Sequence, residues 1–202
     1  MSLDNFKYLY QDNSAAKTLV LLHGTGGDER ELLPLSKHMQ LDANILSLRG
    51  NVTENGMNRF FKRFSTGIFD EENIRQEAEK LRMFITSYLD LYSIKSSDLL
   101  YLGYSNGANM IVSLALLHPR VVSTAVLMHP MLPLETEKSD LHHATFAITY
   151  GENDRMILPT QTQALITTLK DSGAKLEVFS HTGGHEITQD EVAFVSGFLA
   201  LR

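Results

Sequence analysis

Asp98-Leu-Leu-Tyr-Leu-Gly-Tyr-Ser-Asn-Gly-Ala-Asn-Met110 is the stretch of the sequence that decides the fold. A run typical of a buried strand passes directly into a helical pattern through Gly103-Tyr-Ser105-Asn-Gly107. In such an elbow the serine adopts a strained backbone conformation that projects its hydroxyl group, and the glycines let neighbouring backbone pass closely. An isolated match would fit a serine that caps a helix equally well. The position between a strand and an amphipathic helix favours a nucleophile at Ser105.

On both sides of this elbow, short β-rich runs alternate with longer segments of helical period. The predicted strands are 18–22, 44–48, 98–103, 123–128, 144–150 and 174–179, with a weaker edge strand at 6–10. The predicted helices are 29–39, 72–91, 106–117, 159–171 and 188–200. Several strands are apolar almost throughout, as expected of parallel strands buried on both faces. We therefore expect one α/β domain over residues 1–202, with a doubly wound, mostly parallel sheet and the functional site at the carboxyl ends of its strands.

The last two predicted strands each lead into a loop that carries a titratable side chain. Asp154 follows the first of them, and its alternative is Glu152. The shorter aspartate, followed by a run that enters a helix, fits an acid-bearing loop better. His185 follows the second strand, where Gly183-Gly184 gives it a flexible approach, whereas His181 lies too close to its strand. The chain order serine, acid, histidine is that of α/β-hydrolases.

These three residue types support nucleophilic catalysis. A neutral serine is a poor nucleophile, so the chemistry needs an imidazole that takes its proton and a carboxylate that orients and stabilises the imidazole. The oxyanion formed next needs two N–H donors. We expect them from the backbone of Asn106, directly after the nucleophile, and from Thr25 in the glycine-rich turn His23-Gly-Thr-Gly-Gly-Asp-Glu29. This turn lacks the Gly-Lys-Ser/Thr ending of a phosphate-binding loop, so a nucleotide is not expected.

No cofactor or metal is expected. The chain has no cysteine, which excludes thiolate catalysis and most structural zinc sites. The remaining histidines lack the spacing of a metal site and are interpreted as surface or capping residues. They are His38, His118, His129, His142 and His143.

The overall composition narrows the classes of partner. Of the 202 residues, 43% are hydrophobic and 21% are charged, as in ordinary globular proteins. The formal net charge of −6 argues against a nucleic-acid partner. No apolar run approaches the roughly 20 residues of a membrane span. The first residues lack the basic and apolar stretches of a secretory signal, so a cytoplasmic protein is expected.

Taken together, these motifs resemble the phospholipase/carboxylesterase group of α/β-hydrolases, which includes acyl-protein thioesterases and lysophospholipase-like esterases. The resemblance extends through residues 22–29, 49–61, 103–109, 151–154 and 184–185. It is strongest to the short bacterial members, some of which are associated with hydroquinone or copper stress responses. It implies the catalytic triad Ser105, Asp154 and His185, the donors Thr25 and Asn106, and hydrolysis of a small carboxylic ester through an acyl-enzyme. Some members form dimers, so the resemblance is compatible with a homodimer.

Two other functions stay open at this stage. A lysophospholipase or acyl-protein thioesterase would act on longer acyl chains. A non-catalytic ligand-binding member of the fold is the other alternative, because a fold does not determine a function.

The segment 49–70 is irregular and long for a connection in a small domain, which is typical of a binding loop or lid. Acyl-protein thioesterases carry a different, apolar loop here, so long-acyl specificity is not implied. We select Arg59, Phe60 and Phe61 as candidate substrate-binding residues, because aromatic rings beside cations can hold an acyl group and steer a carboxylate.

The cations and the aromatic residues of segment 59–64 could each have a purely structural role instead. Arg59, Lys62 and Arg63 would form a solvated face in one interpretation and attract an anion near a pocket in the other. Phe60 and Phe64 would then simply anchor the loop to the core.

Overall fold

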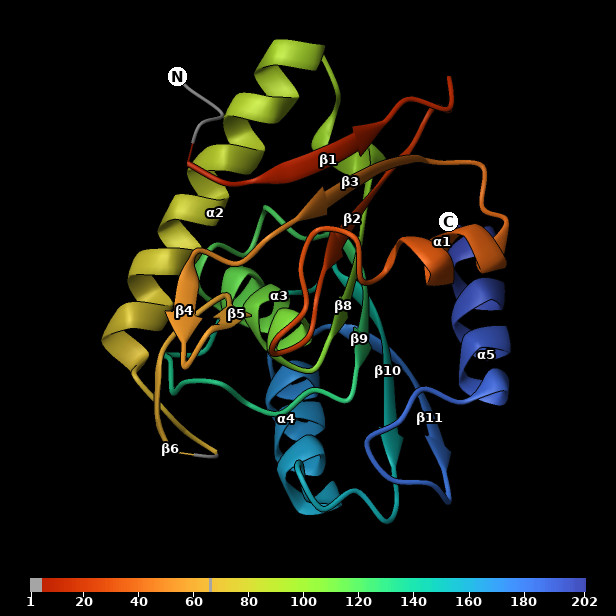
Figure 1. Cartoon of the computed structure of the whole chain (residues 1–202). Coiled ribbons are helices and arrows are strands. Elements are labelled where there is room, and N and C mark those ends of the chain that lie inside the picture. Colours follow the sequence, from red (N-terminus) through yellow and green to blue (C-terminus); the bar gives the residue numbers. More distant parts are fainter. Residues whose placement is uncertain (1–4, 66) are drawn as a thin grey trace.

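The computed structural model describes residues 5–65 and 67–202 and is built around a seven-stranded sheet (Figure 1). The strand order is β1-β3-β2-β8-β9-β10-β11, and every neighbouring pair is parallel except β1 and β3. The bounds are β1 Tyr8–Gln11, β2 Thr18–Leu22, β3 Asn44–Leu48, β8 Leu99–Tyr104, β9 Thr124–Met128, β10 Thr145–Gly151 and β11 Lys175–His181. The predicted doubly wound, mostly parallel sheet is confirmed, with β1 as its antiparallel edge strand.

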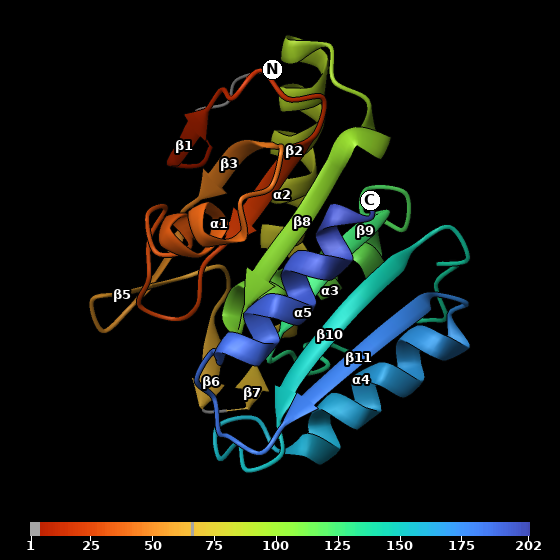
Figure 2. The same ribbon diagram turned by 90° about the vertical axis from the view of Figure 1, so that its right-hand side faces the viewer.

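Helices cover both faces of the sheet. They are α1 Leu33–Met39, α2 Glu71–Tyr92, α3 Asn106–Leu117, α4 Pro159–Asp171 and α5 Gln189–Ala200, with a short 3-10 helix at Ser96–Asp98. One apolar cluster joins the sheet to α2, α3 and α4, and a second joins its other face to α1 and α5. Figure 1 shows the sheet between these two groups, and Figure 2 shows α5 lying along the face opposite α3.

The central strands are apolar throughout because each side chain faces one of these two clusters. In β2, Leu19 and Leu21 belong to the α1–α5 cluster, whereas Val20 and Leu22 belong to the other cluster. Successive side chains of a strand point to opposite faces, so a strand covered on both sides needs apolar residues at every position.

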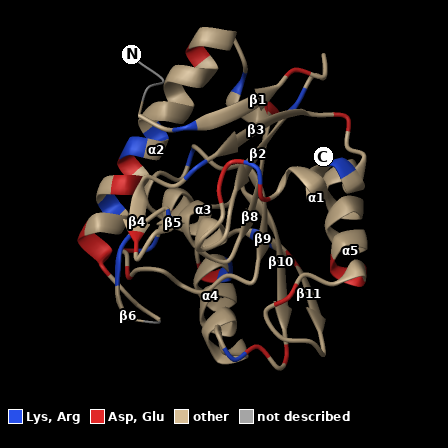
Figure 3. Cartoon of the chain, in the orientation of Figure 1, with Lys and Arg blue, Asp and Glu red and all other residues tan. Residues whose placement is uncertain are grey.

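Helix α2 shows how local sequence positions an element. Asp70 caps its N-terminus by accepting a hydrogen bond from the Asn73 backbone N–H at 3.0 Å. Its apolar stripe packs on the sheet and is buried at Ile74, Ala78, Leu81 and Ile85 and half-buried at Leu89. Charges of both signs alternate along the rest of this helix (Figure 3), where Arg82 pairs with Glu79 and Lys80 with Glu77.

Two local expectations are corrected. The helix expected at 29–39 begins only at Leu33, because residues 29–32 form turns and Pro34 fits the first turn of a helix. The segment 49–70 is not irregular throughout. It forms one hairpin from β4 Val52–Glu54 and β5 Met57–Arg59, and a second from β6 Arg63–Ser65 and β7 Ile68–Phe69. Asn55 and Gly56 both have positive φ, as the tight turn of the first hairpin requires.

Parallel pairing brings the carboxyl ends of β2, β8, β9, β10 and β11 to one edge of the sheet. The loops that follow these strands carry Thr25, Ser105, His129, Asp154 and His185. Chain connections reverse direction across the sheet at β2 and β8, which is where such folds form binding crevices. No helix in the described parts of the chain is both long and apolar enough to cross a membrane.

Candidate active site

The turn between β8 and α3 holds Ser105 in an unusual backbone conformation, with φ 51° and ψ −109°. Its hydroxyl group forms no cap on α3 although the residue occupies the N-cap position. The flanking glycines are required by close backbone contacts. A Cβ at Gly103 would lie 2.6 Å from the Ala108 nitrogen, and one at Gly107 would lie 2.1 Å from the Leu22 oxygen. The strain therefore projects the Ser105 side chain away from the helix.

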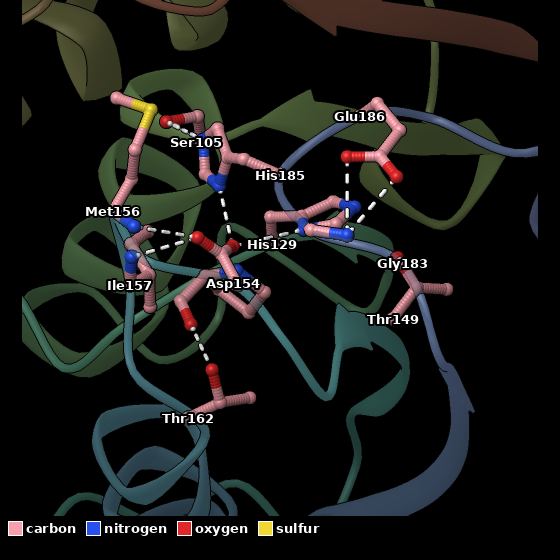
Figure 4. Close-up of polar contacts among 12 residues, drawn as sticks. Ser105, His129, Thr149, Asp154, Met156, Ile157, Thr162, Gly183, His185 and Glu186 are labelled. Atoms are coloured by element: carbon pink, nitrogen blue, oxygen red, sulfur yellow. Dashed lines mark hydrogen bonds and ion pairs between the residues drawn. The ribbon is translucent and has the colours of Figure 1, made fainter.

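The hydroxyl group of Ser105 lies 3.0 Å from His185 Nε2, and His185 Nδ1 lies 2.6 Å from Asp154 Oδ2 (Figure 4). In the tautomer that fits both contacts, Nδ1–H donates to the carboxylate and Nε2 accepts from the serine. The three side chains come from loops after three different strands, β8, β10 and β11. The fold thus brings the three predicted residues together in the order that a proton relay needs.

Asp154 is held by backbone as well as by His185. Its Oδ1 accepts hydrogen bonds from the N–H groups of Met156 at 2.8 Å and Ile157 at 3.0 Å. Burial alone would raise the pKa of Asp154, but these backbone donors and His185 together outweigh burial and lower it. Asp154 is only 3% exposed, and its carboxylate stays ionised.

The alternative acid and base lie elsewhere. The exposed Glu152 accepts a hydrogen bond from Ser180 at 2.9 Å. His181 ends β11, and its Nδ1 accepts a hydrogen bond from the Gly183 backbone N–H at 3.1 Å. Neither side chain contacts Ser105 in these interactions.

The two expected oxyanion donors border the same site. Asn106 is the first residue of α3, so its backbone N–H has no partner within the helix. Its buried side chain accepts a hydrogen bond from the Phe60 backbone N–H at 2.7 Å. The Thr25 turn is fixed by the Gly26 N–H, which donates to the Asn58 carbonyl oxygen at 2.9 Å.

A cavity of about 40 Å³ opens at Ser105. Polar groups on its wall include Thr25, Asn106 and His185, and apolar side chains are supplied by Met131, Met156 and Ile157. Arg59 and Arg63 also line it. Both arginines contact Glu54, at 3.6 Å for Arg59 and 3.0 Å for Arg63.

Arg59 is 2% exposed, so its interpretation as part of a solvated face is corrected. Its guanidinium donates hydrogen bonds to Thr25 Oγ1 at 2.6 Å and to the Phe61 carbonyl oxygen at 3.1 Å. Burial, together with the charge of Arg63, lowers the pKa of Arg59 to about 10, against the opposing effect of Glu54. The side chain stays charged at neutral pH and adds a cation to the wall of the cavity.

The model of one protein family, described as Phospholipase/Carboxylesterase, matches residues 6–202. The chain belongs to the phospholipase/carboxylesterase family. MhqD of Bacillus subtilis (strain 168), which is named as a hydrolase, is 38% identical over 186 residues, covering 92% of this chain and 93% of MhqD. The Bacillus cereus carboxylesterase structure has a TM-score of 0.91 at 35% identity and covers 96% of this chain and 93% of its own. The structure of YahD with malic acid has a TM-score of 0.86 at 27% identity, covering 97% and 98%. The chain has the α/β-hydrolase fold and belongs among ester hydrolases.

Within this member of the phospholipase/carboxylesterase family, two of the candidate substrate-binding residues are corrected. Phe60 and Phe61 are 1% and 0% exposed, belong to the apolar core and do not line the cavity. The ring of Phe60 contacts His23, and that of Phe61 contacts Phe69. The anchoring alternative therefore holds for Phe60 but not for Phe64, which is 76% exposed.

Of the three cations Arg59, Lys62 and Arg63, the two arginines line the cavity and Lys62 is exposed. Arg59 and Arg63 therefore fit the interpretation of cations near a pocket, and Lys62 fits that of a solvated face. Only Lys62 lies on a solvated face.

The interpretation of His129 as a surface or capping residue is wrong, because its side chain is 0% exposed and lies beside Asp154 (Figure 4). Its Nδ1 is 3.3 Å from Asp154 Oδ2, and its Nε2 is 3.3 Å from Glu191 Oε1. By contrast, His118 does cap the C-terminus of α3. The exposed His142 pairs with Asp140 at 2.8 Å. The signal that could have identified His129 is its place directly after β9, at the same edge of the sheet as the loops that carry Ser105, Asp154 and His185.

Within residues 5–65 and 67–202, two groups of side chains have ligand atoms within 4.8 Å of one another, as a metal ion would need: His129, His181 and Glu191, and His129, Asp154 and His185. In the first group, Nδ1 of His181 accepts a backbone N–H, so Nε2 of its neutral ring carries the proton and has no lone pair for a metal. In the second, Asp154 already receives His185 at 2.6 Å. Neither donor set fits a metal ion as it stands.

Proposed function

We propose that this protein is a serine carboxylesterase that hydrolyses small esters through an acyl-enzyme. Ser105 is the nucleophile, His185 the general base and acid, and Asp154 the residue that orients His185. The observation that supports this most is the continuous contact from Ser105 Oγ through His185 to Asp154, at 3.0 and 2.6 Å. Membership of an ester hydrolase family supplies the class of reaction.

In the first half of the reaction, Ser105 Oγ attacks the ester carbonyl carbon while its proton moves to His185 Nε2. The resulting oxyanion is stabilised by the backbone N–H groups of Thr25 and Asn106, each of which contributes about 3 to 4 kcal/mol in enzymes of this type. The carbon–oxygen bond to the alcohol then breaks, and His185 returns the proton to the leaving oxygen.

In the second half, His185 takes a proton from water, and the hydroxide attacks the acyl-enzyme. The bond to Ser105 breaks, the serine recovers its proton from His185, and the carboxylic acid leaves. Asp154 stays ionised throughout and stabilises the imidazolium that forms in each half.

The cavity favours a short acyl group that carries a negative charge. Its volume of about 40 Å³ is far below that of pockets that enclose drug-sized ligands, so the space suits a few carbon atoms. Arg59 and Arg63 place two cations on its wall, and their shared partner Glu54 balances only one of them. YahD, a similar structure, was solved with malic acid, which is a small dicarboxylic acid. Arg59 is therefore kept as a substrate-binding residue, together with Arg63.

A fluorophosphonate probe distinguishes an activated serine from a ligand-binding member of the fold. We expect stoichiometric labelling of the protein on Ser105, identified by mass spectrometry of the modified peptide. The control is the Ser105→Ala variant at the same concentration, which should not react with the probe. A native protein that resists labelling under these conditions would count against the proposal.

A panel of p-nitrophenyl esters tests the substrate class. We expect kcat/KM to be several-fold higher for the succinate half-ester than for the butyrate ester, which has the same number of carbon atoms and no charge. Arg63→Gln should remove most of this difference, and added salt should reduce it, because the attraction is electrostatic. Rates are compared after subtraction of the uncatalysed reaction.

The same panel tests the long-chain alternatives. Each added methylene group favours a long-chain enzyme by about 0.8 kcal/mol of apolar burial. A steady rise of kcat/KM from butyrate to dodecanoate would indicate a lysophospholipase or thioesterase and would contradict the short-acyl assignment.

A further inference from the structure

His129 lies at the centre of a buried group of charged side chains that the proposed reaction does not use. It follows β9 directly and has a positive φ of 50°. His129 and Glu191 are 0% exposed and Asp154 is 3% exposed. Two buried carboxylates on opposite sides of one imidazole are costly unless a cation lies between them.

The hydrogen-bonding capacity of these groups determines the charge of His129. An ionised carboxylate only accepts. Nδ1 of His129 lies within hydrogen-bond distance of Asp154 Oδ2 at 3.3 Å, and Nε2 lies at ion-pair distance from Glu191 Oε1, 3.3 Å, without hydrogen-bond geometry. A neutral ring would turn a lone pair toward one of these two carboxylates, so the arrangement favours a proton on both nitrogens. Burial alone would lower the pKa of His129, but Glu191 and Asp154 outweigh it and raise the pKa. For Glu191, burial would raise the pKa, and His129 and Thr149 together lower it.

Glu191 is itself held from several sides. Its Oε1 accepts a short hydrogen bond from the Thr149 hydroxyl group, and its Oε2 accepts the Thr188 backbone N–H at 3.2 Å in the capping box of α5. His181 Nε2 lies 3.7 Å from the same Oε2, which is beyond hydrogen-bond distance. These contacts fix the Glu191 carboxylate against His129 independently of the substrate.

The group meets the triad at one atom. Asp154 Oδ2 receives His185 at 2.6 Å and His129 at 3.3 Å, while Oδ1 receives two backbone N–H groups. The rings of His129 and His185 have centroids 5.0 Å apart. A cation at His129 therefore lies close enough to repel the second proton that His185 takes up during the reaction.

We propose that His129 is a buried imidazolium, paired with Glu191, that acts as a positioning residue: it holds Asp154 ionised and extends the activity of His185 to lower pH. This role rests on the proposed function, because it acts through Asp154 and His185. Among the residues that the structure describes, the rings of Tyr104 on β8 and His181 at the end of β11 also contact the His129 ring. Glu186, in the loop that carries His185, interacts with His129 electrostatically.

The substitution Glu191→Gln tests this role. It should shift the acid limb of the pH profile in opposite directions according to whether His129 is charged or neutral. Glutamine keeps an acceptor for the capping box, and its amide N–H can donate to His129 Nε2, so His129 becomes neutral without losing a partner. The loss of the cation beside His185 should then move the acid limb of the kcat/KM profile to higher pH by up to about one unit. If His129 were already neutral, the substitution would remove only a negative charge, and the limb would move to lower pH or stay in place.

The matched control is Asp190→Asn. Asp190 is the exposed neighbour of Glu191 in the first turn of α5, so the control removes the same charge from the same helix end without touching His129. Its pH profile should overlay that of the unmodified protein. Thermal unfolding of both variants checks that the fold is retained.

A direct measurement needs no activity and so separates this proposal from the proposed function. In protein labelled with 15N-histidine, one imidazole should show two protonated nitrogens that persist above the pH at which a free imidazole loses one, and Glu191→Gln should remove one of the two protons. The signal is assigned by its loss in a chain that carries both His129→Gln and Glu191→Gln. A singly protonated His129 in the native protein would overturn the proposal. A stoichiometric metal ion found by elemental analysis would also overturn the proposal if its release changed this histidine signal.

Discussion

Replacing Ser105 with alanine is expected to lower kcat for p-nitrophenyl esters by roughly 10⁵- to 10⁶-fold, which is the scale observed when a triad serine is removed. Without the hydroxyl group there is no atom to form the acyl-enzyme, and only the oxyanion donors and substrate binding remain to accelerate attack by water. The steady-state release of p-nitrophenol at saturating substrate measures the effect.

The fold should survive this change. The hydroxyl group of Ser105 contacts His185 and does not cap α3, and alanine bears the same backbone strain as serine at φ 51°. We expect a thermal unfolding midpoint close to that of the unmodified protein. Ser97→Ala removes an exposed hydroxyl group and is the control for the substitution itself. If the Ser105 variant kept most of its activity, the serine mechanism would be wrong.

Replacing Asp154 with asparagine is expected to lower kcat by about 10⁴-fold. The amide Oδ1 can still accept the N–H groups of Met156 and Ile157, so the loop should keep its shape. The amide NH2 would then face His185 Nδ1 and favour the tautomer whose Nε2 carries a proton. That nitrogen can no longer accept the proton of Ser105, and the imidazolium loses its counter-charge.

Glu152→Gln is the matched comparison, because Glu152 is the other carboxylate of the same loop and its exposed side chain accepts a hydrogen bond from Ser180. It should retain nearly full kcat. The assignment of the acid would be reversed if Glu152→Gln lost activity and Asp154→Asn kept it. Both variants are measured across pH 5 to 9, so that a displaced profile is not mistaken for a loss of rate.

Much of the fold is visible in local patterns. The strand, glycine elbow and helix around Ser105 follow from residues that are neighbours in the chain. The prediction that α1 begins at residue 29 is wrong, because residues 29–32 form turns although their charges continue the helical pattern. The local pattern does not predict the hairpin at Asn55-Gly56, because the segment around this turn signal has no strong strand pattern.

The sequence by itself determined the class of fold, the elbow serine and the order of the loops that carry the acid and the base, because these depend on spacing along the chain. Only the tertiary structure decided which side chains are buried and what they touch. Phe60 and Phe61 entered the core, Arg59 remained on the cavity wall, and His129 came to lie between Asp154 and Glu191. The physical reason is that burial and charge pairing arise between segments far apart in sequence, which meet only when the helices pack against the sheet.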